Sequence, residues 1–561
     1  MSKKIYLSFL LTSVLLLTSC SGKFAPTSEY FNVTPDVLEV QAGKVQATVD
    51  GNFPAKSFPA KGLVTITPVL KYEGGEALGT PITLQGSKVK ANNKVIGKEG
   101  GSFSVSSTFN YIPEMSKSEL YLRFNTTLGK KTVEIPDIKV ADGVIATEAL
   151  ANAGTVTPTM ATDKFQRIIK EAHDANIMFL IQQANIRKSE LKSDMIKEFS
   201  NQLNVAAADT AKEIASIELS SYASPDGSVK LNESLASKRE KATLSYLNKE
   251  LKKAKTEGNI DAKFTAEDWE GFQELVNASS IQDKELILRV LSMYNDPEKR
   301  EQEIKNLSSV FETLADEILP KLRRSKMILN VDVIGKTDEQ LKEMAKNEPS
   351  KLNLEELLYA ATLVNCSEKE AIYKSAASQY ANDYRAYNNL GALAYKAGKL
   401  SEAKSYFDKA YSLSKAPEVN SNLGLYSLAT GASASTVNSY LGSAAGAEGL
   451  NEVLGLQYIK NGEYAKAVKS FGDMKTNNAA LAQLLNKDYS KAKATLDAVA
   501  APNAETSYLK ALVGARTNNK DLVVSGLKAA VKADKTYAAK ALKDIEFSKY
   551  LLDADVTDIL K

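Results

Sequence analysis

Hydrophobic and polar residues follow three different spacings along the chain. Between residues 30 and 140, apolar positions alternate with polar ones in short runs, such as residues 37–41, 44–49 and 102–106, and pairs of Gly or Asn separate the runs. Alternation with a period of two is typical of strands that bury one face, and turn residues between such runs are typical of antiparallel all-β folds. The pattern therefore predicts an antiparallel β-sandwich over residues 30–140.

The middle of the chain mixes strand and helix patterns. Apolar runs at residues 177–183, 214–223 and 327–333 predict strands, and helical spacing over residues 195–203 and 232–247 predicts helices between them. We interpret residues 164–340 as one α/β domain with a helical insertion at about 256–320 that covers the sheet and buries Trp269. Residues 141–163, rich in Ala and Thr, are predicted to be a linker.

The last third of the chain carries helical repeats. Tyr373 recurs as Phe407 after 34 residues, and the run Asn388-Asn389-Leu390-Gly391 has a second copy in Asn422-Leu423-Gly424. This pattern resembles the tetratricopeptide repeat, which implies an all-α solenoid over residues 351–561, with about five units and a C-terminal capping helix. The resemblance also implies a groove that binds peptides or partner proteins, although a purely architectural stalk stays an alternative.

Three polar residues mark that predicted groove. Asn388, Asn389 and Asn422 stand at the start of the first helices of their units. We expect their side chains to reach the backbone of an extended peptide from a partner protein.

A strand–turn–helix motif in the middle domain carries a second resemblance. The turn Ser224-Pro225-Asp226-Gly227 follows a predicted strand, and Asn232 and Arg239 lie on the next helix. The motif resembles the peptidoglycan-binding C-terminal domain of the OmpA family, in which an Asp after the strand and an Arg fifteen positions later hold diaminopimelate. Ser224 stands where the family has Asp, so Asp226 is expected to substitute in a site with Asn232 and Arg239. The alternative makes Asp226 a turn residue and Arg239 a structural helix residue.

The first twenty residues predict the compartment. Lys3 and Lys4 precede an apolar run over residues 5–17, and Leu17-Thr18-Ser19-Cys20 resembles the bacterial lipobox. Residues 1–19 are then a signal peptide, and Cys20 is the lipidated N-terminus that anchors the protein in a membrane; an ordinary signal peptide with a chance Cys is the alternative. Residues 21–28 lack the acidic cluster that sends some Gram-negative lipoproteins to the cell surface, so the resemblance to lipoproteins implies an outer-membrane protein facing the periplasm. Cys366 would be left alone, and its helical context predicts burial.

Composition narrows the function. The 561 residues contain 71 Lys and Arg against 68 Asp and Glu, one His and two Cys. This balance gives no reason to expect nucleic acid, and so few His and Cys argue against metal sites. We expect no metal and no cofactor, and no enzyme, because no spacing singles out a catalytic group. His173 is expected just before the first strand of the middle domain, as a surface or capping residue rather than a general base. The resulting hypothesis is a lipid-anchored envelope scaffold that binds envelope proteins or peptides and contacts peptidoglycan. The alternative is a structural tether between outer membrane and cell wall.

Overall fold

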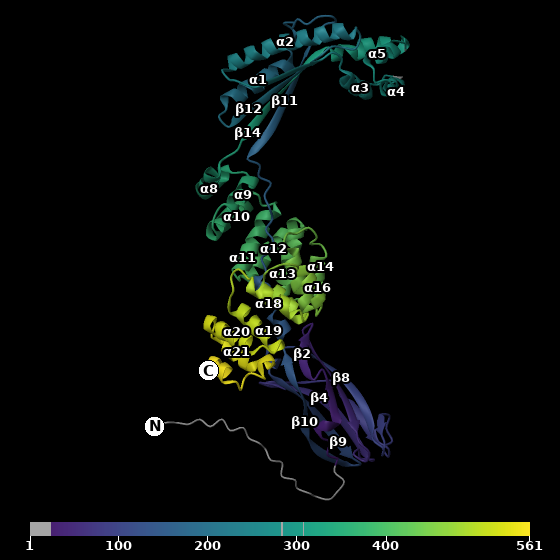
Figure 1. Cartoon of the computed structure of the whole chain (residues 1–561), viewed down its shortest axis with the longest axis vertical. Helices are drawn as coiled ribbons and strands as arrows, with labels where there is room; N and C mark the ends of the chain where they lie inside the picture. The colour runs from purple at the N-terminus through teal and green to yellow at the C-terminus, as the bar shows by residue number, and fades with distance from the viewer. Residues whose placement is uncertain (1–23, 282–283, 307) are drawn as a thin grey trace. The chain divides into compact units, whose positions relative to one another are not determined.

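The computed structural model describes residues 24–281, 284–306 and 308–561, which divide into two compact units. Unit 1 combines the chain up to Ala161 with Tyr380–Lys561, and unit 2 is Thr162–Gln379. Unit 2 is thus inserted, in sequence, between the two parts of unit 1 (Figure 1). The predicted signal peptide and Cys20 lie outside the described residues. Within the described residues, no helix has the length and apolar character that crossing a bilayer requires.

The first part of unit 1 is a β-region. Within the described residues its ten strands form one connected sheet, in the order β1-β3-β2-β10-β9-β4-β6-β7, with β5 paired to β4 and β8 paired to β3. The strands are β1 Phe31–Thr34, β2 Val37–Gln41, β3 Lys44–Phe53, β4 Gly62–Tyr72, β5 Gly75–Leu78, β6 Ile82–Gly86, β7 Lys94–Ile96, β8 Gly101–Asn110, β9 Ser118–Leu128 and β10 Lys131–Ile145.

The alternation of apolar and polar residues along the strands produces the hydrophobic core of this β-region. Along β3 and β8 every second side chain is buried, and these side chains join one apolar cluster with those of β4 and β9. Gly51 allows the ring of Phe103 to lie against the backbone of β3, because a Cβ at residue 51 would stand 2.0 Å from that ring. Two details of the prediction are wrong: β2 with β10 and β6 with β7 pair in parallel, and β10 extends past residue 140 to Ile145.

Unit 2 is built on a four-stranded sheet in the order β11-β14-β12-β13, where only β12 and β13 run parallel. Its strands are β11 Ile168–Met178, β12 Lys212–Tyr222, β13 Ile260–Thr265 and β14 Arg324–Ile334, and the helices α1 Asp194–Ala208 and α2 Val229–Ala254 pack on it. The first strand begins earlier than the predicted 177–183 and ends at Met178, so most of the predicted range lies in the following loop. The earlier residues 168–174 are mostly exposed and carry little apolar signal. His173 lies inside this strand rather than before it.

The predicted insertion at 256–320 is not purely helical, since it contributes strand β13. Its helices are α3 Trp269–Ala278, α4 Lys284–Met293, α5 Pro297–Asn306, α6 Ser308–Glu317 and α7 Leu319–Leu322. Among the described residues, α3, α4, α6 and α7 share an apolar cluster of their own, distinct from the core of the sheet, and Trp269 packs against that cluster while partly exposed. Unit 2 ends with α8 Asp338–Asn347, α9 Leu354–Thr362 and α10 Cys366–Gln379. Cys366, predicted to be buried, is exposed at the start of α10.

The rest of unit 1 is a solenoid of helical hairpins. Its helices are α11 Tyr384–Lys396, α12 Leu400–Leu413, α13 Pro417–Ala429, α14 Ala434–Leu441, α15 Leu450–Lys460, α16 Tyr464–Phe471, α17 Asn477–Leu485, α18 Tyr489–Asp497, α19 Ala504–Arg516, α20 Lys520–Ala533, α21 Thr536–Lys543 and α22 Ala554–Leu560. Within a hairpin the helices approach closely, since a Cβ at Gly391 would stand 2.5 Å from the ring of Phe407. The predicted first hairpin, α9 and α10, groups with unit 2 instead. Short 3-10 helices are Ser28–Tyr30, Pro113–Ser116, Thr147–Leu150 (η3), Ala153–Thr155 (η4), Glu190–Lys192, Pro349–Lys351 and Ile545–Phe547 (η7).

Candidate functional site: an extended segment held by the solenoid

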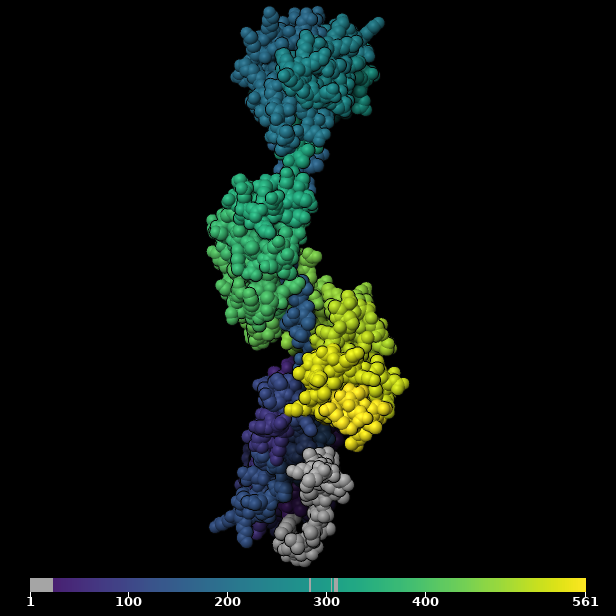
Figure 2. Space-filling view, turned by 90° about the vertical axis from the view of Figure 1, so that its left-hand side faces the viewer, coloured from purple at the N-terminus to yellow at the C-terminus, as the bar shows by residue number. Residues whose placement is uncertain are grey.

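Residues 147–161, here called the groove segment, are not a free linker. They run along the first helices of the hairpins in unit 1, and part of the segment is visible as a blue band beside the green and yellow helices (Figure 2). Ala153 and Val156 are buried and belong to the same apolar cluster as Phe407 and Leu423. Packing therefore fixes a stretch whose composition alone suggests flexibility.

Three asparagines hold the backbone of the groove segment in the same way. Asn389 accepts from the N–H of Ala161 at 2.7 Å and donates to its carbonyl at 3.0 Å. Asn422 makes the same two bonds to Thr159, both at 2.8 Å, and Asn478 makes them to Asn152 at 3.0 and 2.9 Å. A side-chain amide carries a donor and an acceptor, so it can pair with a backbone as a neighbouring strand would. We call these contacts the asparagine clamps.

Further polar groups connect the clamps. Asn388 donates to the carbonyl of Thr159 at 3.0 Å and accepts from Asn422 at 2.9 Å, and the hydroxyl of Tyr395 donates to the carbonyl of Ala153 at 3.0 Å. Asn388, Asn389 and Asn422 are at most 1% exposed. Burying a polar group costs free energy unless the group is hydrogen-bonded. Each of these bonds therefore replaces a hydrogen bond to water that the buried backbone has lost.

Two glutamates continue the pattern on the first helices of later hairpins. Glu452 of α15 accepts from the backbone of Thr157, and Glu505 of α19 bonds to the side chain of Asn152. Burial raises the pKa of both carboxyl groups. Each first helix from α11 to α19 thus supplies a polar side chain to the segment, which runs antiparallel to the order of the hairpins.

The start of the segment fastens the β-region to the solenoid. The Glu148 carboxylate accepts from the N–H groups of Ala42 and Gly43, each at 2.9 Å, and from the hydroxyl of Tyr464 at 2.7 Å. Burial raises the pKa of Glu148, although these three donors act in the opposite direction. One carboxylate therefore joins the β2–β3 turn to the helix α16.

The predicted partner-binding residues do contact an extended backbone, but it belongs to the same chain. Asn388, Asn389 and Asn422 are brought together, and their capacity is used by Thr159 and Ala161. Binding of a partner by these three residues stays a prediction. Sequence reasoning missed Asn478, whose signal is the second Asn pair, Asn477-Asn478, at the start of a first helix.

In unit 2, the structure places the predicted peptidoglycan-binding residues around one small cavity. Arg239 is 1% exposed and donates to the backbone carbonyls of Gln183 at 3.0 Å, Tyr222 at 2.8 Å and Leu180 at 3.3 Å. Burial lowers the pKa of Arg239 to about 10. The guanidinium therefore links the loop that follows β11 to the end of β12. This favours the interpretation of Arg239 as a structural residue.

The acid side of the same cavity is also paired. Asp226 accepts from Ser224 Oγ at 2.6 Å and from Arg323 at 2.8 Å, while Asn232 donates to Gly227 and Glu267. The cavity between them has a volume of about 40 Å³, room for a few water molecules. Contact with peptidoglycan stays a prediction, and it requires these side chains to exchange their present partners.

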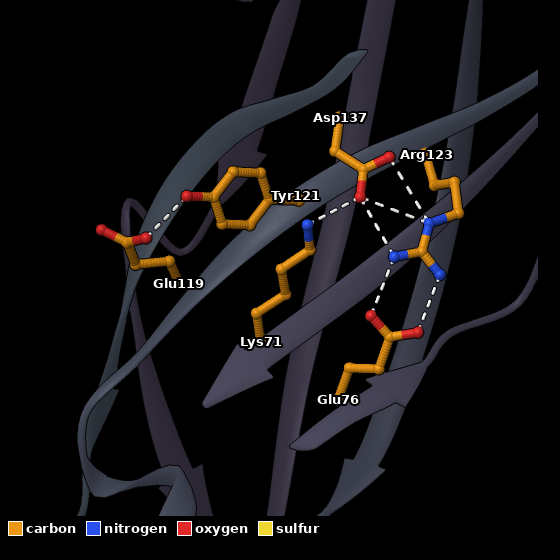
Figure 3. A network of polar contacts seen from close by, with 6 residues as sticks. All are labelled: Lys71, Glu76, Glu119, Tyr121, Arg123 and Asp137. Carbon is orange, nitrogen blue, oxygen red and sulfur yellow. Dashed lines mark hydrogen bonds and ion pairs between the residues drawn. The ribbon is translucent and has the colours of Figure 1, made fainter. Parts of the chain in front are cut away.

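The β-region carries a contrasting, exposed cluster of charges. Arg123 forms a two-pronged pair with Glu76, with both distances 2.8 Å, and Asp137 accepts from Arg123 and Lys71 at 3.1 and 2.7 Å (Figure 3). Opposite charges already neutralise one another there, so the cluster offers no unpaired charge to a ligand. Among the described residues, no group of three or more His, Cys, Asp or Glu is placed to hold a metal ion.

Comparisons with known proteins find only low-scoring structural similarity. No known family and no curated protein matches the sequence. A tetratricopeptide repeat protein from Parabacteroides merdae is similar to the structure with 15% identity and a TM-score of 0.28, over 37% of this chain and 91% of that one. The Cut9–Hcn1 hetero-tetramer of the APC/C is similar with 14% identity and a TM-score of 0.31, over 60% of this chain and 76% of that one. These TM-scores are too low to support an argument. The assignment of helical repeats therefore rests on the helical hairpins that the structure shows in this chain.

Proposed function

We propose that the protein is a non-enzymatic scaffold of the bacterial envelope, an outer-membrane lipoprotein anchored at Cys20 and facing the periplasm. Its solenoid binds other proteins, and its β-region, taken as a sandwich, is held against the solenoid as a fixed support. The protein uses no cofactor. The observation that carries this proposal is the set of asparagine clamps, which hold an extended chain by its backbone.

The clamps support a binding role because they contact backbone atoms rather than particular side chains. Extended peptides gain affinity from backbone hydrogen bonds and specificity from neighbouring side-chain pockets. The groove segment occupies the positions between α11 and α19, so we place partner binding on the open surface beside it.

Site-specific photo-crosslinking in intact cells tests this proposal. A photoreactive residue at Lys460, in the last turn of α15, should give discrete protein adducts, whereas one at the exposed Lys528 on α20 should not. Adducts at neither position, or the same adducts at both, would contradict partner binding beside the groove. For the anchor, Cys20→Ala should release the protein from membranes, and unchanged partition would contradict lipidation.

Contact with peptidoglycan is the second candidate, and the partly exposed pair Asp226–Arg323 beside Ser224 supports it, because a zwitterionic ligand needs both charges. Sedimentation with purified peptidoglycan tests it. Arg323→Ala should abolish sedimentation, and Lys321→Ala, which removes a neighbouring charge, should not. If neither the unmodified protein nor the variants sediment with peptidoglycan, peptidoglycan binding is contradicted and the OmpA-like resemblance concerns the fold alone.

A further inference from the structure

A cavity of about 560 Å³ lies beside the groove segment, inside unit 1. It is lined by residues 149–154, by the ends of the first helices α11, α13 and α15, and by residues of α19 and α21. Cavities of several hundred Å³ are typical of binding sites. Because the cavity adjoins a chain that is already extended, a second extended chain could lie next to the first.

The charges in this cavity are unbalanced. Lys396, Lys460 and Lys540 line it, and Glu505 is the one carboxylate among its lining residues. None of the three lysines takes part in an ion pair within the described part of the chain, whereas Lys543, one turn beyond Lys540, pairs with Glu73 at 2.8 Å. The cavity therefore differs from the charge cluster of the β-region, where each cation has an acidic partner.

Lys540 is held in place without a paired anion. Its ammonium group lies 5.0 Å from the ring centres of Tyr508 and Tyr537. Burial lowers its pKa, while the carboxylates of Glu505 and Asp544 act in the opposite direction. Burial also raises the pKa of Glu505, so the charge of this carboxylate is disfavoured where it lies.

We propose that this lysine cavity binds an acidic, extended segment of a partner protein. The proposal rests on the proposed function and adds the chemistry of the partner. Lysines from three separate helices border one hollow, which suits several carboxylates spaced along a chain better than one small anion. Tyr395 and Tyr537 add apolar surface between the charges.

Fluorescence anisotropy with the full chain tests the proposal. The probe is a labelled octapeptide of alternating Glu and Ser, and its matched control carries Gln in place of Glu. We expect the acidic peptide to bind in a salt-sensitive manner and the Gln peptide to bind at least about tenfold more weakly, since each factor of ten corresponds to about 1.4 kcal/mol.

Two triple variants separate the cavity from general charge. Lys396→Gln, Lys460→Gln and Lys540→Gln together should weaken the acidic peptide at least about tenfold. Lys475→Gln, Lys528→Gln and Lys532→Gln remove the same charge from exposed positions outside the cavity and should change binding less than about twofold.

The remaining outcomes overturn the inference. If both triple variants lose the same affinity for the acidic peptide, the attraction is non-specific. If free glutamate displaces the labelled peptide as strongly as unlabelled peptide does, the cavity binds small anions instead. If the acidic peptide does not bind, the lysine cavity is not a binding site, but adducts at Lys460 in the crosslinking experiment would still support the proposed scaffold function. If the peptide binds but no protein is crosslinked, the cavity is supported as a binding site and the scaffold function is contradicted.

Discussion

The asparagine clamps of unit 1 and the contacts of Arg239 in unit 2 both bury polar side chains, and all of these residues except Asn478 are predicted from the sequence to bind a ligand. In unit 1, Asn389 and Asn422 contact backbone more than 200 residues away in sequence. In unit 2, Arg239 on α2 contacts Tyr222 at the end of β12 and Leu180 just after β11. Both sets stabilise the fold, but only the first builds a surface on which an extended chain lies.

The comparison teaches that burial and pairing do not distinguish a binding site from a structural one. Every buried polar group needs a partner, and the backbone is the nearest partner in both units. What distinguishes a candidate site is the charge that the fold leaves without a counterion. By that criterion the lysine cavity is a better candidate than either set of buried residues.

The largest effect is expected for Asn422→Leu. The change removes both bonds to Thr159 and the bond to Asn388. It leaves the buried N–H of Thr159 and the side-chain oxygen of Asn388 unpaired, which should cost unit 1 about 4 kcal/mol. Hydrogen exchange of residues 152–161 measures the loss directly, since Thr159 and Ala161 should lose protection. The exposed Asn451→Leu is the control and should leave protection unchanged; loss of protection in both would contradict the assigned role.

A slightly smaller effect is expected for Arg239→Ala. Three backbone carbonyls each lose a hydrogen bond from the guanidinium, so unit 2 should lose about 3 kcal/mol of stability. Trp269 is the only tryptophan and lies in unit 2, so its fluorescence follows the denaturation of that unit. Lys238→Ala, at the exposed neighbouring position, should be neutral. If Arg239→Ala kept full stability but abolished peptidoglycan sedimentation, Arg239 would be a ligand-binding residue after all.

Periodicity made much of the fold predictable, whereas the site depended on contacts that no local pattern reports. The alternation along β3 and the 34-residue recurrence that links Tyr373 to Phe407 were sufficient for strands and hairpins. The groove segment was not predictable, because its Ala and Thr residues have weak preferences and become ordered only through packing and the clamps. Cys366 shows the same limit, since a helical apolar run predicts burial but not which end of the helix meets solvent.

A smaller effect is expected for the pH dependence of the stability of unit 1, which involves Glu505 in the lysine cavity. Burial raises the pKa of Glu505 above its ordinary 4.5. The folded state then binds the proton more tightly, so this group adds stability fully below pH 4.5, and the gain is lost as pH rises through the raised pKa. Glu505→Gln should remove this gain, so the free energy of unfolding of the variant should rise less between pH 7 and 4.5 than that of the unmodified protein. Glu114→Gln, on the exposed surface of the β-region, should leave the pH profile of thermal unfolding unchanged.

The smallest effect is expected in the exposed charge cluster of Figure 3. Arg123 contacts both Glu76 and Asp137, yet its side chain is 39% exposed. Solvent and salt screen such pairs, so Arg123→Ala should cost less than about 1 kcal/mol, and the cost should fall further in high salt. Thermal unfolding at low and high salt measures both quantities. A loss as large as that of Asn422→Leu would mean that exposed charges stabilise unit 1 as strongly as the buried clamps, and the contrast between the two kinds of polar cluster would fail.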